Sequence, residues 1–339
     1  MVDDSGDNLI FLISQPRAGS TMLQRILSEH PEIYTVAEPW LMLHPFYALK
    51  PGGISAEYNG ELAYQALQGF IQTLPGKEDD YIQGIRRMYH FLYQRALQNT
   101  DKHYFLDKTP RYYFIIRDLY RTFPAARFVF LLRNPLSVLN SILHTWTIFF
   151  LYRFGDDLLR APQLLLEGSM ALGEKAYITH YESIVQDPAG QIQALCKWIG
   201  VPFSSQMLEY DPGQTTHWDF GDKEGIRQQK SPTVVGFDKW IESLKNPQIW
   251  RLSDSYLRVL GRDTIVRLGY SYDELYEILL ANKPGRMRLW GSLPLSWWLK
   301  KPQRECLTIR TAFARFAKSI QRRGLRETVN MGTRMVLQR

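Results

Sequence analysis

The fold is decided by the stretch Leu9-Ile10-Phe11-Leu12-Ile13-Ser14-Gln15-Pro16-Arg17-Ala18-Gly19-Ser20-Thr21. It opens with an apolar run that predicts a buried strand, and a helical pattern begins just after it, at Met22. A turn between a strand and a helix leaves unpaired backbone N–H groups at the helix N-terminus, where the helix dipole also favours an anion. Gly19 lets a ligand approach the backbone closely, and Ser20 and Thr21 add hydroxyl donors. The stretch therefore predicts a phosphate-binding strand, loop and helix.

This loop differs from the Walker A loop of P-loop NTPases. The Walker A motif requires G-x-x-x-x-G-K-[ST], whereas this loop has a single glycine and places its cation, Arg17, before it. The expected anion is therefore not the γ-phosphate of a nucleotide bound by a P-loop NTPase. A nucleotide or metabolite kinase stays an alternative, although the missing lysine argues against it.

Further predicted strands alternate with helical patterns along the chain. Short apolar runs predict strands at 33–36, 104–107, 127–132 and 176–179, and helical patterns cover 61–74, 81–99, 113–123, 137–150 and 189–200. Such alternation is typical of parallel βαβ units with right-handed crossovers. We therefore expect an α/β fold with a central, mostly parallel sheet.

The charge of the chain is concentrated at its C-terminal end. Residues 283–339 hold 14 Lys and Arg against two acids, a net charge of +12, so residues 1–282 carry −5 of the overall +7. We expect an α/β domain at 1–282 and a helical, basic extension at 283–339. Within the extension, 307–323 is predicted to form a basic amphipathic helix, which fits an anionic membrane surface, an acidic protein partner such as an acyl carrier, or packing on the chain's own core. Nucleic acid is not expected, because no binding motif accompanies the charge.

Other features of the composition restrict the class of protein. Cys196 and Cys306 are too few for a disulfide framework and lack zinc-ligand spacing, and the seven histidines form no metal-binding pattern. Residues 1–7 lack the charged and apolar regions of a signal peptide, and no run approaches eighteen apolar residues. We expect a cytoplasmic protein without a metal, with the basic extension as a candidate peripheral contact with a membrane.

A second anion site is predicted where the strand at 127–132 ends. Arg133 lies beyond the carboxyl end of that strand, where ligands bind in open α/β sheets, and Ser141 follows about two helical turns later. Two separate phosphate sites on one sheet suggest a nucleotide phosphorylated at both ends.

In their order and spacing the two motifs resemble those of sulfotransferases that use 3′-phosphoadenosine 5′-phosphosulfate (PAPS). Residues 16–21 resemble the loop that binds the 5′-phosphosulfate, and Arg133-Asn134-Pro135 with Ser141 resembles the 3′-phosphate motif. The resemblance extends over about 9–270 and implies a P-loop-NTPase-like three-layer sandwich, PAPS as donor and 3′-phosphoadenosine 5′-phosphate (PAP) as product. It also implies adenine contact by Tyr181 and a late loop that closes over the nucleotide. The implied nucleotide-binding residues are Arg17, Ala18, Gly19, Ser20, Thr21, Arg133, Ser141, Tyr181, Arg227, Lys230, Ser231 and Lys239.

The resemblance also implies the catalytic groups. The cytosolic branch of the family uses the histidine of a Lys-x-His motif as its base, but here Lys108 is followed two residues later by Pro110, which cannot accept a proton. The tyrosylprotein branch has a glutamate 21 positions beyond its loop arginine, and Glu38 lies 21 positions beyond Arg17. Glu38 is therefore the predicted base, with Arg17 and Lys108 as cations beside the transferred group. His217 is the rival base.

The predicted function is in-line transfer of a sulfuryl group from PAPS to a hydroxyl of an unidentified acceptor, which is a small molecule or a lipid-like or carrier-bound alcohol. The aromatic segment at 146–154 could line a hydrophobic acceptor pocket, but a helix packed on both sides explains its composition slightly better. A non-catalytic nucleotide-sensing membrane adaptor is a further alternative to the kinase. The joint presence of Arg17, Glu38 and Lys108 favours an enzyme.

Overall fold

A computed structural model of the chain describes residues 4–146, 148–209, 231 and 238–285. The chain divides into two compact units, of which unit 1 comprises residues 1–134 and 161–237, and unit 2 comprises residues 135–160 and 238–339. The expected basic extension at 283–339 lies outside the described residues apart from 283–285.

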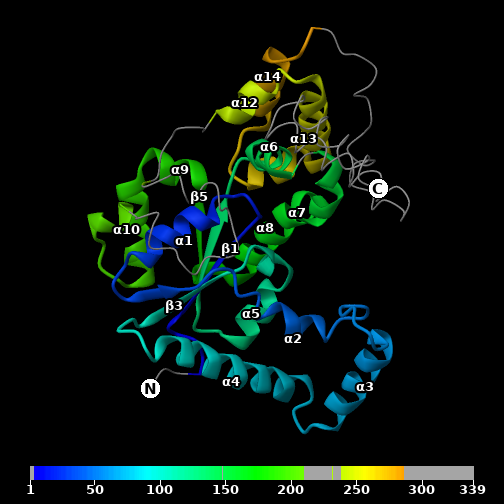
Figure 1. Ribbon diagram of the computed structural model, residues 1–339, viewed down its shortest axis with the longest axis vertical. Coiled ribbons are helices and arrows are strands. Elements are labelled where there is room, and N and C mark those ends of the chain that lie inside the picture. Colours follow the sequence, from blue (N-terminus) through cyan, green and yellow to red (C-terminus); the bar gives the residue numbers. More distant parts are fainter. Residues whose placement is uncertain (1–3, 147, 210–230, 232–237, 286–339) are drawn as a thin grey trace, which may run out of the picture. The chain divides into compact units, whose positions relative to one another are not determined.

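Unit 1 is built on a parallel sheet (Figure 1). In its described part the strands are β1 (Leu9–Ser14), β2 (Ile33–Thr35), β3 (Tyr104–Lys108), β4 (Arg127–Leu132) and β5 (Ala176–His180), in the order β2-β3-β1-β4-β5. Every neighbouring pair is parallel. Because β1 lies in the middle, the loop that follows it is flanked by the carboxyl ends of β3 and β4. The predicted parallel sheet is confirmed.

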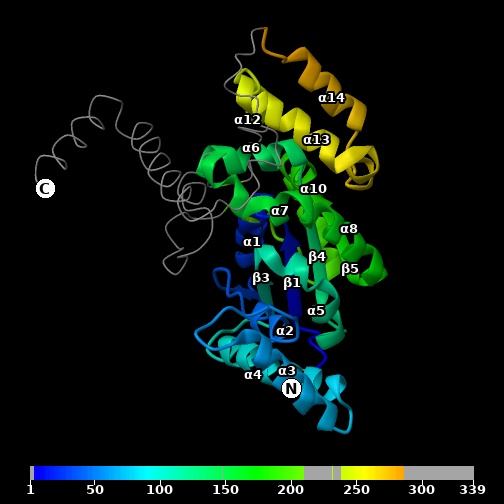
Figure 2. The ribbon, with the colours of Figure 1, turned by 90° about the vertical axis from the view of Figure 1, so that its right-hand side faces the viewer.

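Helices cover both faces of this sheet (Figures 1 and 2). Ile10 and Leu12 of β1 face a cluster that includes α1 (Ser20–Ser28), α9 (Tyr181–Gln186) and α10 (Pro188–Ile199). Phe11 points the other way and stacks against Phe128 at 5.4 Å between ring centroids. The rings of Tyr112 and Phe123 also contact Phe11, at 6.2 and 6.0 Å. That second face carries α4 (Glu78–Leu97), α5 (Ile116–Thr122) and α8 (Ala161–Leu172). A strand buried on both faces is a continuous apolar run, and the α/β fold predicted from such runs is confirmed. The helices on both faces also agree with the sandwich that the resemblance implies.

The remaining described elements of unit 1 are short or lie at its edge. They are α2 (Leu43–Tyr47), α3 (Gly60–Thr73), η1 (Pro110–Phe114), η3 (Gly173–Lys175) and η4 (Ser205–Leu208), where η marks a 3₁₀ helix. The prediction of one helix over 113–123 was wrong. Pro110 begins a 3₁₀ turn, and Ile115 leaves the helical region with φ of −134°, so that α5 starts only at Ile116.

The described part of unit 2 is helical. Its elements are α6 (Pro135–Trp146), η2 (Ile148–Phe154), α7 (Gly155–Leu159), α12 (Lys239–Ser243), α13 (Pro247–Arg267) and α14 (Tyr272–Ala281). The helix predicted over 137–150 therefore ends early, at Trp146, and a 3₁₀ helix covers Ile148–Phe154. Leu151 and Phe154 of that 3₁₀ helix are buried in the core of the unit. The ring centres of Trp146 and Phe154 lie 4.7 Å apart, which agrees with the packed alternative for this aromatic segment. Among the described helices, none has the length and apolar character needed to cross a membrane.

Candidate active site

The loop after β1 reverses the chain sharply before α1. Arg17 has φ of 71° and Gly19 has φ of 94°, both in the left-handed region, and Gly19 caps the N-terminus of α1. A Cβ atom at Gly19 would lie 2.4 Å from Cδ2 of Tyr181, which is closer than atoms can approach. The loop therefore needs glycine both for its backbone conformation and for the ring that packs on it.

Arg133 borders the loop on the side of β4. Its Nη1 donates a hydrogen bond of 2.9 Å to the backbone oxygen of Arg17, and its guanidinium carbon lies 4.1 Å from the centre of the Tyr181 ring. The Nε of Arg133 is buried and has no hydrogen-bond partner among the described residues. A buried N–H that lacks a protein acceptor in this part of the chain is suited to an anionic ligand. Next to it, the backbone N–H of Asn134 donates to Glu182 at 3.0 Å.

Lys108 borders the loop on the other side, at the end of β3. Its Nζ lies 2.8 Å from Oε1 of Glu38 and 3.5 Å from the hydroxyl oxygen of Thr21. The Lys108 side chain is 0% exposed, whereas 12% of the Glu38 side chain is exposed. Three predicted site residues, Lys108, Glu38 and Thr21, thus meet at the start of α1.

Burial and the neighbouring acid have opposite effects on Lys108. Desolvation lowers the pKa of its ammonium group, and the Glu38 carboxylate opposes this through its charge and its hydrogen bond. A buried charge is stable in a protein only when it is paired, so the Glu38 carboxylate is the counterion that Lys108 requires.

Glu38 begins a short segment with a strained backbone. Trp40, two residues later, has φ of 56°, an uncommon conformation for a residue other than glycine. Its indole N–H donates to Oε2 of Glu38 at 3.3 Å, and Arg111 lies over its ring. Both carboxylate oxygens of Glu38 are therefore hydrogen-bonded, one to Lys108 and the other to Trp40.

A buried polar network beneath this segment was missed by the sequence analysis. Asp107, next to Lys108, accepts hydrogen bonds from the hydroxyls of Tyr93 at 2.6 Å, Tyr112 at 2.9 Å and Thr109 at 3.2 Å. Burial raises the pKa of Asp107 to about 6, and the three hydroxyl donors and Lys108 partly offset this. The polar run Asp107-Lys108-Thr109 at the end of a buried strand was the available signal, because buried polar residues in such a run require partners.

The remaining predicted site residues belong to other parts of the chain. Ser141 lies in α6 of unit 2, and Lys239 is the exposed first residue of α12, also in unit 2. Ser231 is exposed. Arg227, Lys230 and the rival base His217 lie outside the described residues. Among the described residues, no group of three His, Cys, Asp or Glu side chains is arranged to hold a metal ion.

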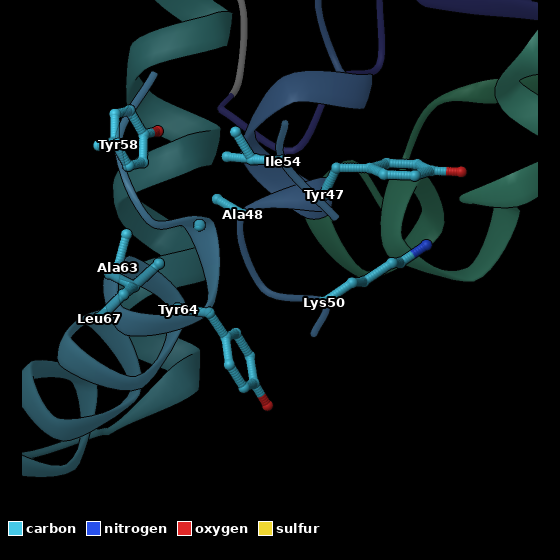
Figure 3. A pocket seen from close by; sticks show the side chains of 9 residues that line it. Tyr47, Ala48, Lys50, Ile54, Tyr58, Ala63, Tyr64 and Leu67 are labelled. Carbon is cyan, nitrogen blue, oxygen red and sulfur yellow. The ribbon is translucent and has the colours of Figure 1, made fainter. Parts of the chain in front are cut away.

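A cavity of about 150 Å³ lies elsewhere in unit 1, between the α2–α3 connection and α3 (Figure 3). In Figure 3 the side chains of Tyr47 and Lys50 extend to the same side, where the ammonium group lies 4.6 Å from the ring centre. The predicted site residues in the described part of the chain do not line this cavity. Its lining residues are Tyr47, Ala48, Lys50, Ile54, Tyr58, Gly60, Ala63, Tyr64 and Leu67.

Comparison with known proteins places the chain in a family. The model of the sulfotransferase family matches residues 9–205, which is more than half of the chain, so the chain belongs to the sulfotransferase family. The prediction that the chain is a sulfotransferase is thereby confirmed.

Individual relatives agree with this assignment. The nodulation protein NoeE of Sinorhizobium fredii is 25% identical over 77% of this chain, which spans 66% of that protein's length. A putative protein-tyrosine sulfotransferase of Caenorhabditis briggsae is 21% identical over 76% of this chain and 90% of its own length. Among solved structures, the sulfotransferase domain from the curacin biosynthetic pathway matches with a TM-score of 0.51 and 22% identity, over 77% of this chain and 97% of that domain. This structural likeness supports the fold.

Proposed function

We propose that this protein transfers a sulfuryl group from PAPS to a hydroxyl group, with Glu38 as the general base. The observation that carries the proposal is the position of the Lys108–Glu38 pair, which contacts Thr21 at the N-terminal turn of α1. A carboxylate that can accept a proton and an ammonium that can offset negative charge thus border an anion-binding loop. Sulfuryl transfer to a hydroxyl requires these groups.

The residues beside the loop fit a nucleotide that is phosphorylated at both ends. Residues 16–21 would hold the 5′-phosphosulfate through backbone N–H groups and the hydroxyls of Ser20 and Thr21. Arg133 would hold the 3′-phosphate together with Ser141, and its buried Nε, which lacks a partner among the described residues, supports this role. Tyr181, packed over Gly19, would contact adenine. Arg227, Lys230, Ser231 and Lys239 would complete the nucleotide site.

The chemistry divides between the donor and the protein. PAPS supplies the sulfuryl group, whose bond to the phosphate oxygen breaks as the acceptor oxygen bonds to sulfur. Glu38 accepts the proton of the acceptor hydroxyl through its carboxylate. Lys108 and Arg17 offset the negative charge on the sulfuryl oxygens and on the leaving phosphate, in a partly buried site where such interactions are stronger than in water.

Two alternatives are weaker. A kinase lacks support from the family assignment and from the loop, which has no P-loop lysine. A nucleotide-sensing membrane adaptor would have no use for a carboxylate paired with a buried lysine beside the loop.

The acceptor and the location are proposed from the sequence. We propose a small-molecule, lipid-like or carrier-bound alcohol as acceptor, and a cytoplasmic protein that contacts anionic membranes through its basic extension.

The proposal is tested by a transfer assay with purified protein. PAPS is supplied with a panel of aliphatic alcohols, phenols and sugars, and both sulfated product and PAP are measured. We expect sulfate ester and PAP in equal amounts with at least one hydroxyl class, and no phosphorylated product when ATP replaces PAPS. Phosphoryl transfer from ATP, or tight PAP binding without turnover on any acceptor, would contradict the proposal.

A further inference from the structure

Hydrogen bonds connect the segment that carries Glu38 to the buried carboxylate of Asp107 at the end of β3. The backbone N–H of Trp40 donates to the hydroxyl oxygen of Thr109 at 3.2 Å, and the backbone N–H of Met42 donates to the hydroxyl oxygen of Tyr112 at 3.1 Å. Each of these hydroxyls in turn donates its proton to Asp107. Two relays of the same form therefore run from Asp107 to the backbone just beyond Glu38.

The direction of these hydrogen bonds depends on the carboxylate. A hydroxyl group has one proton to donate and two lone pairs to accept with. Because Asp107 is an acceptor while ionised, it takes the protons of Thr109 and Tyr112 and leaves their lone pairs for the amide groups of Trp40 and Met42. If a hydrogen-bond donor replaced Asp107, the hydroxyl of Thr109 or Tyr112 would have to accept from it. The backbone amide that this hydroxyl now accepts from would then lose its acceptor.

The backbone that these relays hold is strained. Trp40 has φ of 56°, in the left-handed region that is unfavourable for a residue with a Cβ atom. This conformation also brings the Trp40 indole within hydrogen-bond distance of Glu38. The two relays thus hold the backbone at the point where it is unfavourable. That unfavourable conformation at Trp40 lets its indole orient the Glu38 carboxylate.

We propose that Asp107 is a positioning residue for sulfuryl transfer, which acts through Thr109 and Tyr112 to hold the Trp40–Met42 backbone and so align Glu38 with Lys108. This inference rests on the proposed role of Glu38 as base. Asp107 itself touches neither the loop nor the reacting groups through any described hydrogen bond. It sets the geometry in which the base meets the acceptor hydroxyl, and small displacements of a base carry large costs in rate.

Tyr93 provides a matched control within the same network. Its hydroxyl donates to the same carboxylate at 2.6 Å, and its ring is as deeply buried as that of Tyr112. Unlike the Tyr112 hydroxyl, it accepts no described hydrogen bond from the backbone of the Glu38 segment. A purely structural role for the network predicts similar effects for Tyr93→Phe and Tyr112→Phe. A positioning role predicts that only Tyr112→Phe impairs the reaction.

The experiment measures kcat and KM for PAPS in full-length Tyr112→Phe, Tyr93→Phe, Thr109→Val and Thr109→Ser, with thermal unfolding to verify folding. We expect Tyr112→Phe and Thr109→Val to lower kcat by about ten- to a hundredfold, with KM changed by less than about threefold. Tyr93→Phe and Thr109→Ser, which keep the relays, should stay within about threefold of the parent in kcat. Equal losses in Tyr112→Phe and Tyr93→Phe would overturn the inference.

A double variant separates this inference from the proposed function. If Asp107 acts through Glu38, Tyr112→Phe should cause no further loss of kcat in a Glu38→Gln background, because coupled residues are not additive. A full further loss in that background would refute the positioning role while Glu38 remained the base. A Glu38→Gln variant with parental kcat would instead refute the proposed base itself.

Discussion

Lys108 and Arg133 flank the loop after β1, at the ends of β3 and β4, the two strands that pair with β1. The two side chains differ in their contacts. Lys108 is fully buried, and its ammonium contacts Glu38 and Thr21, whose side chains come from two other segments. Arg133 lies against the ring of Tyr181 and a backbone oxygen, and its buried Nε has no partner among the described residues. The difference supports the proposed division of roles, in which the β3 side would arrange groups for chemistry and the β4 side would keep a donor for a bound anion.

The largest effect is expected on the β3 side. Glu38→Gln keeps the size of the side chain and removes its ability to accept a proton, so kcat should fall by about 10²- to 10⁴-fold. PAP affinity should stay within about threefold, because Glu38 is not assigned to the nucleotide. Turnover is measured by sulfate transfer and affinity by calorimetry. A variant with full turnover would place the base elsewhere, and His217 would be the next candidate.

On the β4 side, Gly19→Ala should weaken PAP binding by about tenfold or more. The new methyl group would collide with Tyr181, which would have to move away from its position over the loop. Gly52→Ala is the matched control, because Gly52 also has a positive φ, of 62°, but no described atom lies within 4 Å of a Cβ built there. Both variants carry the backbone strain, so equal PAP affinities in the two would show that the Tyr181 contact has no part in binding.

The pKa of Asp107 predicts how the stability of the β3 side depends on pH. The folded protein raises this pKa from 3.8 to about 6, so the folded state holds a proton that the unfolded state releases. The stabilisation from this group is complete below about pH 4 and is lost as the pH rises through about 6. Two pKa units correspond to about 3 kcal/mol, and each kcal/mol shifts Tm by about 2–4 °C in a domain of this size.

The variant Asp107→Asn lacks this titration and isolates its contribution. The difference in Tm, taken as parent minus variant, should therefore decrease by several degrees as the pH rises from 4.5 to 7. The measurement is thermal unfolding of both proteins across that range. A difference that does not change with pH, or that rises with pH, would contradict the raised pKa.

The smallest effect on turnover is expected from removal of the basic extension, because no extension residue is proposed for the active site. A chain that ends at residue 285 should keep parental turnover on a soluble acceptor and should sediment less with anionic liposomes. The full-length chain with neutral liposomes is the control. Unchanged sedimentation with anionic liposomes would refute the membrane contact, and loss of turnover would show that the extension takes part in the site.

The sequence predicted the parts of this site that depend on local patterns. The bounds of β1 and β4 follow from continuous apolar runs, and the loop after β1 follows from one glycine between a strand and a helix. Parallel pairing then places Lys108 and Arg133 on either side of that loop, because β3 and β4 both neighbour β1.

The Asp107 network could not be predicted in this way, because its members are distant in the sequence. The amide of Met42 meets Tyr112 across 70 positions, and Tyr93 reaches Asp107 from α4. No periodicity relates such residues. The end of α6 was also missed, because an apolar pattern that continues past Trp146 fits a 3₁₀ turn packed in a core as well as it fits an α-helix.

The division between the two sides is tested most directly by calorimetry with PAP and with adenosine 5′-monophosphate, which lacks the 3′-phosphate. We expect the parent protein to bind PAP about 10²-fold more tightly than the monophosphate, since Arg133 would make charged hydrogen bonds to the additional phosphate. Arg133→Ala should remove most of that difference and leave the affinity for the monophosphate nearly unchanged. Equal affinities of the parent protein for the two nucleotides, or an Arg133→Ala variant that still prefers PAP as strongly, would contradict it.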